Sequence, residues 1–263
     1  MTEMIQEKIV ENLRVKIYKN RGMMGAAAAE DVAKRINDLL AQKEFVNIIF
    51  AAGVSQNDFL HFLSNQQDVS WNRVNAFHMD EYIGLKENAD QLFGNFLKER
   101  LFDKVPFRAI YYINGNSSNA QDECDRYADL LIQNPPDIVC MGIGVNTHIA
   151  FNDPHVANFN DPQLVKMVEM DQVCRQQQVD DGCFDQLSKV PISAITLTVP
   201  ALISANYIYC IVPGAHKSQA VYHTLNSEIS EKHPSTILRK LSNAILYLDV
   251  DSSQRPLPGI NSM

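Results

Sequence analysis

The stretch Asp137–Pro154, DIVCMGIGVNTHIAFNDP, decides the fold class of this chain. Its apolar part, Ile138–Gly142, lacks polar alternation, which is typical of a parallel strand covered on both faces. In sheets of such strands, ligands bind beyond the carboxyl ends of the strands. The glycine-punctuated turn at this position carries four polar side chains: Asn146, His148, Asn152 and Asp153. The stretch therefore predicts an α/β protein with a candidate site at this turn.

The rest of the chain repeats the alternation of strand and helix. Seven further runs rich in β-branched and aromatic residues predict strands at Val15–Tyr18, Val46–Ala52, Val74–Met79, Ala109–Ile113, Ala194–Leu197, Tyr207–Val212 and Ala244–Val250. Stretches of helical period predict helices at Ala26–Leu40, Asn88–Leu101, Ala120–Ile132 and His216–Leu225. This pattern predicts a single three-layer α/β/α domain over residues 1–263, doubly wound around a mostly parallel, Rossmann-like sheet.

The least regular segment is Pro154–Lys189, which is polar, rich in glutamine and weakly periodic. An insertion of this length in a compact domain predicts a lid at about residues 155–189. The plainer interpretation is a short surface helix, QLVKMVEM, between loops, and both interpretations can hold together.

Composition excludes several classes of protein. The chain has 263 residues, 46% of them apolar and 21% charged, and a net charge of −8. These values predict a soluble globular protein without a nucleic-acid partner or an anionic-membrane surface. The N-terminus has no secretory apolar region, and the five cysteines form no CxxC motif, so we expect a cytoplasmic protein. We also expect no metal and no cofactor, because no motif for either occurs.

Polar residues also follow the predicted strands before and after this turn. Gly53 and Ser55 form a turn before a helix, where free N–H groups and a hydroxyl suit a phosphate. Asp80 and Glu81 are paired acids at a strand end, where a carboxylate can act as a general base. Lys217 opens a helix, which suits a position shared with an anion. Each pattern alone also fits an ordinary capped turn or a solvated charge.

His148 has two interpretations on its own. It can be a general acid or base whose tautomer is fixed by Asn146 or Asp153. It can also be a hydrogen-bonded core residue in the apolar HIAF segment. The glycine turn before it and the polar Asn152-Asp153-Pro154 after it favour the functional interpretation.

Two motifs, FHMDEYIGL (Phe77–Leu85) and GIGVNTHIAFNDP (Gly142–Pro154), resemble the glucosamine-6-phosphate deaminase/isomerase family. That family shows FNMDEYVGL and GxGxDGHIAFNEP at the corresponding strand ends. The resemblance extends over most of the chain, including FAAGVSQNDFL and CIVPGAHKSQAV. The sister 6-phosphogluconolactonases share the fold but show DERxVP at the first motif, so DEYIGL favours the aminosugar branch.

The resemblance implies a role for each matching residue. Asp80 would move a proton between C2 and C1 of the open-chain sugar, and His148 would open the ring at its oxygen. Asp153 would orient His148, while Lys217 and the Gly53–Ser55 turn would hold the 6-phosphate. The imine formed by isomerisation would be hydrolysed to ketose 6-phosphate and ammonia, without a cofactor.

The remaining candidates lie in or near the two motifs. Glu81, Gly144 and Thr147 are expected to line the substrate site, and Thr147 stands where the family has glycine. Asn146 replaces an aspartate of the family, and a neutral amide should make the imidazole a weaker base. The family's phosphate-binding arginine has no direct counterpart, and Arg175 in the predicted lid is the nearest candidate, ahead of residues 176–178.

The sequence leaves three functional hypotheses. The leading one is an enzyme that deaminates or isomerises glucosamine 6-phosphate, galactosamine 6-phosphate or a related aminosugar phosphate. The second is a sugar-phosphate sensor with weakened catalysis, suggested by Asn146 and Thr147. The third is a 6-phosphogluconolactonase-like hydrolase. The sequence leaves the oligomeric state open, with a homo-oligomer as one alternative, because the family that it resembles includes monomers as well as hexamers.

Overall fold

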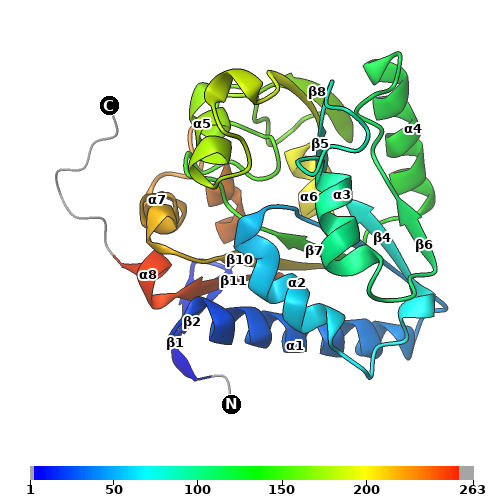
Figure 1. The fold of residues 1–263 in the computed structure, drawn as a ribbon. Helices are drawn as coiled ribbons and strands as arrows, with labels where there is room; N and C mark the ends of the chain where they lie inside the picture. The colour runs from blue at the N-terminus through cyan, green and yellow to red at the C-terminus, as the bar shows by residue number, and fades with distance from the viewer. Residues whose placement is uncertain (1–2, 255–263) are drawn as a thin grey trace.

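A computed structural model describes residues 3–254 and is built around an eight-stranded sheet (Figure 1). In spatial order the strands are β1 (Met4–Val10), β2 (Leu13–Tyr18), β11 (Ala244–Asp249), β10 (Tyr207–Val212), β7 (Ile138–Met141), β3 (Val46–Phe50), β4 (Val74–His78) and β6 (Ala109–Tyr111). All neighbouring pairs are parallel except the β1–β2 hairpin. The predicted mostly parallel sheet is therefore confirmed.

The winding direction of the sheet reverses between β3 and β7. From β3 the chain proceeds outward through β4 to β6, and from β7 it proceeds the other way through β10 to β11. The two central strands pair in parallel, with Ile48 opposite Ile138 and Phe50 opposite Cys140. The loops that leave their carboxyl ends diverge to opposite sides, which opens a crevice at this point.

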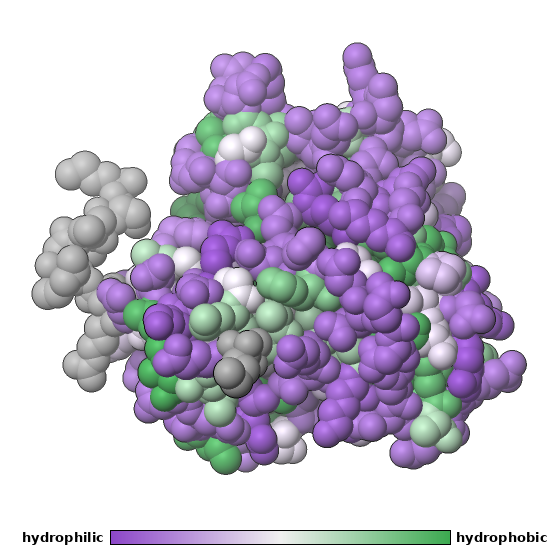
Figure 2. Space-filling model, turned by 60° about the horizontal axis from the view of Figure 1, so that its bottom comes forward, coloured by the Kyte–Doolittle hydropathy of each residue, from purple (hydrophilic) through white to green (hydrophobic). Residues whose placement is uncertain are grey.

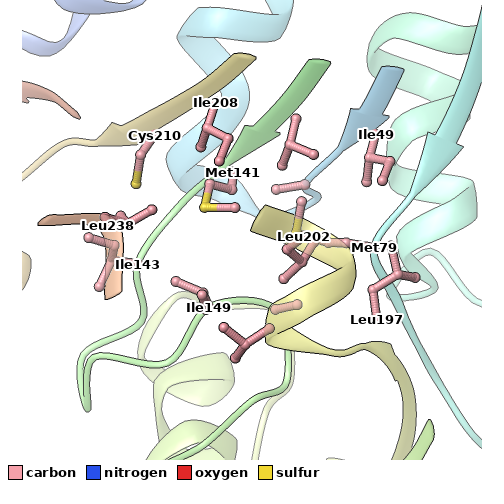
Figure 3. Packing of buried hydrophobic residues seen from close by; sticks show 14 of the residues in the cluster. Ile49, Met79, Met141, Ile143, Ile149, Leu197, Leu202, Ile208, Cys210 and Leu238 are labelled. Carbon is pink, nitrogen blue, oxygen red and sulfur yellow. The ribbon is translucent and has the colours of Figure 1, made fainter. Parts of the chain in front are cut away.

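The two faces of the sheet carry separate hydrophobic clusters because successive side chains of a strand point to opposite faces. Ile49, Met141, Ile208 and Cys210 belong to one cluster, which packs against α4 (Ala120–Gln133) and α6 (Val199–Ile203), as Figure 3 shows around Leu202. The other cluster packs against α1 (Arg21–Leu40) and α2 (Asn57–Ser64). The structure thus has the predicted three layers.

A second, three-stranded antiparallel sheet lies beyond the main one. It consists of β5 (Asp80–Tyr82), β9 (Ser193–Leu197) and β8 (Val165–Glu169) in the order β5-β9-β8. The expected helix at QLVKMVEM is wrong, because this segment is β8 and pairs with β9. The helix of the predicted lid lies further on, as α5 (Gln172–Asp180), and Figure 1 shows it with β8 on one side of the main sheet.

Helix boundaries differ most from the prediction in two places. Helix α1 begins five residues before the predicted start, because Asn20 caps it by accepting a hydrogen bond from the Met23 N–H. The helix predicted over Asn88–Leu101 shortens to α3 (Phe93–Leu97), which continues as the π-helical segment η3 (Lys98–Phe102). The remaining helices are α7 (Ser218–Asn226) and α8 (Val250–Ser253).

Hydrophilic side chains cover most of the face shown in Figure 2, and the apolar areas on it are small and scattered. Within residues 3–254, none of the helices combines the length and the apolar character needed to span a membrane.

We predict that close packing of α1 on α2 outweighs helix propensity at Gly25. A Cβ atom at this position would lie 2.8 Å from Asp58 Cβ and 2.9 Å from Phe59 N. Although alanine favours a helix by about 1 kcal/mol over glycine, we expect Gly25→Ala to lower the free energy of unfolding by about 1–3 kcal/mol through overpacking. Urea unfolding followed by circular dichroism measures this change.

Gly22→Ala is the matched control in the same helix. Its Cβ would meet only the Asn20 side chain, at an ordinary 3.5 Å, so we expect a neutral or slightly stabilising effect, below about 1 kcal/mol. Equal effects of the two substitutions would contradict the packing argument.

Candidate active site

A cleft of about 600 Å³, part of it open to solvent, lies at the point where the winding of the sheet reverses. Its walls come from the loop after β3, the loop after β7, the start of β5, helix α5 and the turn after β10. Four residues predicted from the sequence line it, namely Asp80, Gly144, His148 and Lys217, together with the Gly53–Ser55 turn. Segments far apart in the sequence therefore converge on the expected end of the sheet.

The turn after β3 presents free backbone donors to the cleft. Gly53 has φ 114°, a conformation that favours glycine, and it is followed by the 3-10 turn η1 (Val54–Gln56). Within residues 3–254 the N–H groups of Val54 and Ser55 donate no hydrogen bond. Ser55 does not cap the following helix, and its hydroxyl accepts a hydrogen bond from Gln56 Nε2. Free N–H groups of this kind suit an anion.

Lys217 enters the same end of the cleft from the turn after β10. This turn repeats the geometry of the first: Gly214, at φ 92°, precedes the 3-10 turn η5 (Ala215–Lys217). The Asp249 carboxylate fixes it by accepting the Gly214 N–H at 3.1 Å. Lys217 is only 2% exposed, and burial lowers its pKa to about 8 although the charge of Asp181 opposes this. A buried ammonium group stabilises a bound anion strongly because solvent does not screen it.

His148 is held by two side chains of its own loop. Its Nδ1 lies 2.7 Å from Asn146 Oδ1 and 3.1 Å from Asp153 Oδ1, so the proton of the neutral imidazole is on Nδ1. Asn146 in turn donates its amide N–H to Asp153 Oδ1 at 2.9 Å. Burial alone would raise the pKa of Asp153, but hydrogen bonds from His148 and Asn146 outweigh it and lower this pKa. The Nε2 atom is left free to exchange a proton.

The His148 ring packs directly against the backbone of Gly144. A Cβ atom on Gly144 would lie 2.0–2.3 Å from three atoms of the His148 ring, so only glycine fits there. Thr147 lies at φ 73° although it is not glycine, and its side chain donates to the Asn146 carbonyl rather than facing the cleft. The Thr147 side chain therefore contributes to the shape of the loop, and the expected place of Thr147 in the substrate site stays a prediction.

Asp80 is a buried acid that faces the cleft. It is 6% exposed, and burial together with the charge of Glu81 raises the pKa of its carboxyl well above the usual range. The buried His78 holds its backbone: Nδ1 donates to the Asp80 carbonyl at 2.9 Å, while Nε2 accepts the Ile113 N–H. Burial lowers the pKa of His78 to about 4, so this imidazole stays neutral. A carboxylate with a raised pKa is a stronger base.

Glu81 points away from the cleft. Its carboxylate accepts N–H groups from Tyr82, Phe93 and Gly94, and the last two belong to the start of α3. Burial raises its pKa to about 7 although these three hydrogen bonds oppose the shift. Glu81 therefore anchors α3 behind Asp80, and its expected part in binding substrate stays a prediction.

Arg175 is not in the cleft either. Its guanidinium donates to the backbone carbonyls of Leu187, Val190 and Pro191, which closes the segment after α5. Of the three glutamines that follow it, Gln177 and Gln178 line the cleft in its place. These contacts hold Arg175 within the lid segment, and its expected role as a phosphate ligand stays a prediction.

Two site residues were missed by the sequence analysis. Cys174 on α5 places its Sγ 4.0 Å from His148 Nε2. Gln56 lies in the cleft wall with its Nε2 donating to the Ile211 carbonyl, and its Oε1 has no partner among the described residues. The position of Gln56 shortly after Gly53 is a signal that the sequence offers for a residue in the cleft wall. No local pattern around Cys174 indicates that it lies in the site.

Comparison with known proteins agrees with this geometry. The sequence profile of the family described as glucosamine-6-phosphate isomerases/6-phosphogluconolactonase matches residues 19–247. The chain belongs to this family. It is 33% identical over 225 residues to a glucosamine-6-phosphate deaminase of Bacillus cereus, covering 85% of this chain and 83% of the relative. A Bacillus anthracis protein of the same name is 32% identical with the same coverage.

Solved structures of the family share the fold. A monomeric glucosamine-6-phosphate deaminase superposes with a TM-score of 0.84 at 24% identity, covering 91% of this chain and 98% of the other. A 6-phosphogluconolactonase from Thermotoga maritima gives a TM-score of 0.73 at 18% identity, with coverage of 89% and 98%. Both branches of the family therefore have the architecture described here.

We predict that Asn146 and Asp153 are matched to each other. Asn146→Asp would place a second carboxylate where an amide nitrogen now lies 2.9 Å from Asp153 Oδ1. Like charges at this distance raise a carboxyl pKa by about 1–3 units, so we expect lower turnover and a free energy of unfolding reduced by about 1–3 kcal/mol at neutral pH. Denaturant unfolding and steady-state kinetics measure both effects.

The double variant Asn146→Asp/Asp153→Glu supplies the control. It restores the aspartate and glutamate that the family motif shows, and the longer side chain can separate the two charges. We expect it to be more stable than Asn146→Asp alone, with a coupling free energy of roughly 0.5–3 kcal/mol. Strictly additive effects would show that the two positions are independent.

Proposed function

We propose that this protein is an aminosugar-phosphate deaminase, which converts glucosamine 6-phosphate or a close analogue to ketose 6-phosphate and ammonia. The observation that carries the proposal is the convergence of Asp80, His148 and Lys217 on one cleft. The named relatives act on glucosamine 6-phosphate according to their names. A carboxylate, an imidazole and an anion site are the groups that this reaction requires.

The chemistry divides between the two titratable groups. His148, whose Nδ1–H is fixed by Asn146 and Asp153, exchanges a proton through Nε2 at the ring oxygen and opens the sugar. Asp80 then removes the C2 proton and returns it to C1, which converts the aldose into an imine at C2. Water adds to this imine, and ammonia leaves as the ketone forms.

Other residues of the same cleft support phosphate binding. The ammonium of Lys217 and the free N–H groups of Val54 and Ser55 provide one charge and two fixed dipoles for a phosphate. Gln178 adds an amide from the segment that covers the cleft. A substrate held there extends towards Asp80 and His148.

The proposal extends to the setting of the enzyme. We place it as one catalytic domain over residues 1–263 whose segment 155–189 acts as a lid, and as a cytoplasmic enzyme of aminosugar catabolism. The supporting observation for the lid is that α5 supplies Gln177 and Gln178 to the cleft wall.

Ammonia release from glucosamine 6-phosphate tests the proposed function. We expect turnover by the natural chain and a loss of roughly 100- to 10,000-fold in kcat for Asp80→Asn, which lacks the base. Galactosamine 6-phosphate and 6-phosphogluconolactone are the comparison substrates. Ammonia release no faster than in Asp80→Asn, or acid release from the lactone alone, would contradict the proposal.

Glu81→Gln is the matched control for Asp80→Asn. It changes the neighbouring buried acid, whose carboxylate serves the backbone of α3 and lies outside the cleft. We expect a lower melting temperature because an amide N–H₂ would face backbone donors, with kcat changed by only a few-fold, well short of the roughly 100-fold expected of a general base.

We predict that affinity for a phosphorylated ligand depends on pH through Lys217. With a pKa of about 8, the lysine of the free protein is charged below pH 8 and neutral above it, and only the charged form attracts phosphate. A sugar phosphate remains a dianion across this range because its second pKa is about 6. We therefore expect the Kd for fructose 6-phosphate to rise about tenfold per pH unit above pH 8.

Calorimetric titration between pH 7 and 9.5, in buffers of different ionisation enthalpy, measures both the Kd and the proton taken up. Lys217→Arg is the control, because a guanidinium stays charged throughout this range. Its affinity should not vary with pH. A Kd of the natural chain that is constant from pH 7 to 9.5 would remove Lys217 from the phosphate site.

A further inference from the structure

A potential metal ligand, the Sγ atom of Cys174, lies on the side of His148 that faces α5. Asn146 and Asp153 occupy Nδ1, and the free Nε2 lies 4.0 Å from the Sγ of Cys174 on α5. One donor atom each from His148, Asp153 and Cys174 lies within 4.8 Å of the others, and all three residues are buried. Cys174 lies in a different segment of the chain from His148 and Asp153, so no short motif indicates the cluster.

Thiolate, imidazole and carboxylate are the ligands that zinc prefers in proteins. Zinc bonds of about 2.3 Å to sulfur and 2.0–2.1 Å to nitrogen place these two donors roughly 3.5 Å apart in a tetrahedral site. The present separation of 4.0 Å is close to that value, so rotation of the Cys174 side chain suffices. We propose that His148 and Cys174, with Asp153 beside them, bind zinc or another soft divalent cation.

The charges around the cluster have both signs. The carboxylates of Asp153 and Asp80 act on the Cys174 thiol, and the Lys217 ammonium acts on it with the opposite sign. Binding of a cation would replace the thiol proton with a metal–sulfur bond and release that proton to solvent.

A buried hydroxyl without a hydrogen-bond partner among the described residues, that of Tyr82, lies in the same hydrophobic cluster as Cys174. It therefore offers a donor or acceptor to water bound at an open coordination position.

Metal binding would have a direct consequence for the proposed function, on which this part of the inference rests. The cation would occupy Nε2 of His148, the atom assigned to proton transfer, and would join α5 to the loop after β7. Zinc should therefore inhibit turnover reversibly and compete with the sugar phosphate.

Cobalt(II) absorption tests the site without any substrate. A cobalt ion bound by thiolate and imidazole gives a sulfur-to-metal charge-transfer band in the near ultraviolet and tetrahedral bands in the visible. We expect one cobalt per chain with these bands, displaced by zinc. The bands should disappear in Cys174→Ser and in His148→Gln, and persist in Cys183→Ser, which changes the half-buried cysteine that follows α5.

Removal of an outer-shell partner lowers metal affinity about 10–100-fold. Cys174→Ser removes a direct ligand, so we expect a larger loss of zinc affinity. In the ammonia assay, micromolar zinc should inhibit the natural chain and Cys183→Ser, with recovery on adding a chelator, and should inhibit Cys174→Ser far less. Absence of cobalt bands, or bands unchanged in Cys174→Ser, would overturn the proposal. Because these spectra need no turnover, an absence of deaminase activity would leave the metal test intact.

Discussion

The parallel pairing of β3 with β7 is the constraint on which the structure depends. It brings the carboxyl ends of two strands together while their connections leave in opposite directions, so the crevice follows from topology and needs no further support. Every charged group of the cleft then reaches it from the end of a strand or from the segment that covers it. The identity of the residues there, rather than the fold, separates deaminase from lactonase chemistry.

The sheet was predictable because strands buried on both faces leave continuous apolar runs, such as Ile138–Gly142 and Tyr207–Val212. The smaller sheet was not, since β8 buries Val165 and Val168, and apolar residues three apart resemble one side of a helix. Helix α3 was misplaced for a tertiary reason. The buried Glu81 carboxylate accepts the Phe93 and Gly94 N–H groups and so sets where the helix begins.

The candidate site also has a part that the sequence predicts and a part that it does not. Asp80, His148 and Lys217 follow strands whose positions the sequence predicts, so their convergence could be expected before the structure was known. Cys174 and Arg175 lie on α5, and their environments depend on how that segment folds over the sheet. The Arg175 guanidinium satisfies carbonyls that no local pattern places beside it.

The burial of Lys217 also links ligand supply to the lifetime of the protein. At neutral pH the empty cleft holds an ammonium ion at a desolvation cost that unfolding would relieve. A bound phosphate offsets this cost in the folded state only, which adds to the ordinary stabilisation of a protein by its ligand. Cells that provide the sugar phosphate would thus hold a larger folded fraction and expose fewer chains to proteases. Metabolite concentration would in this way influence how much of the protein persists.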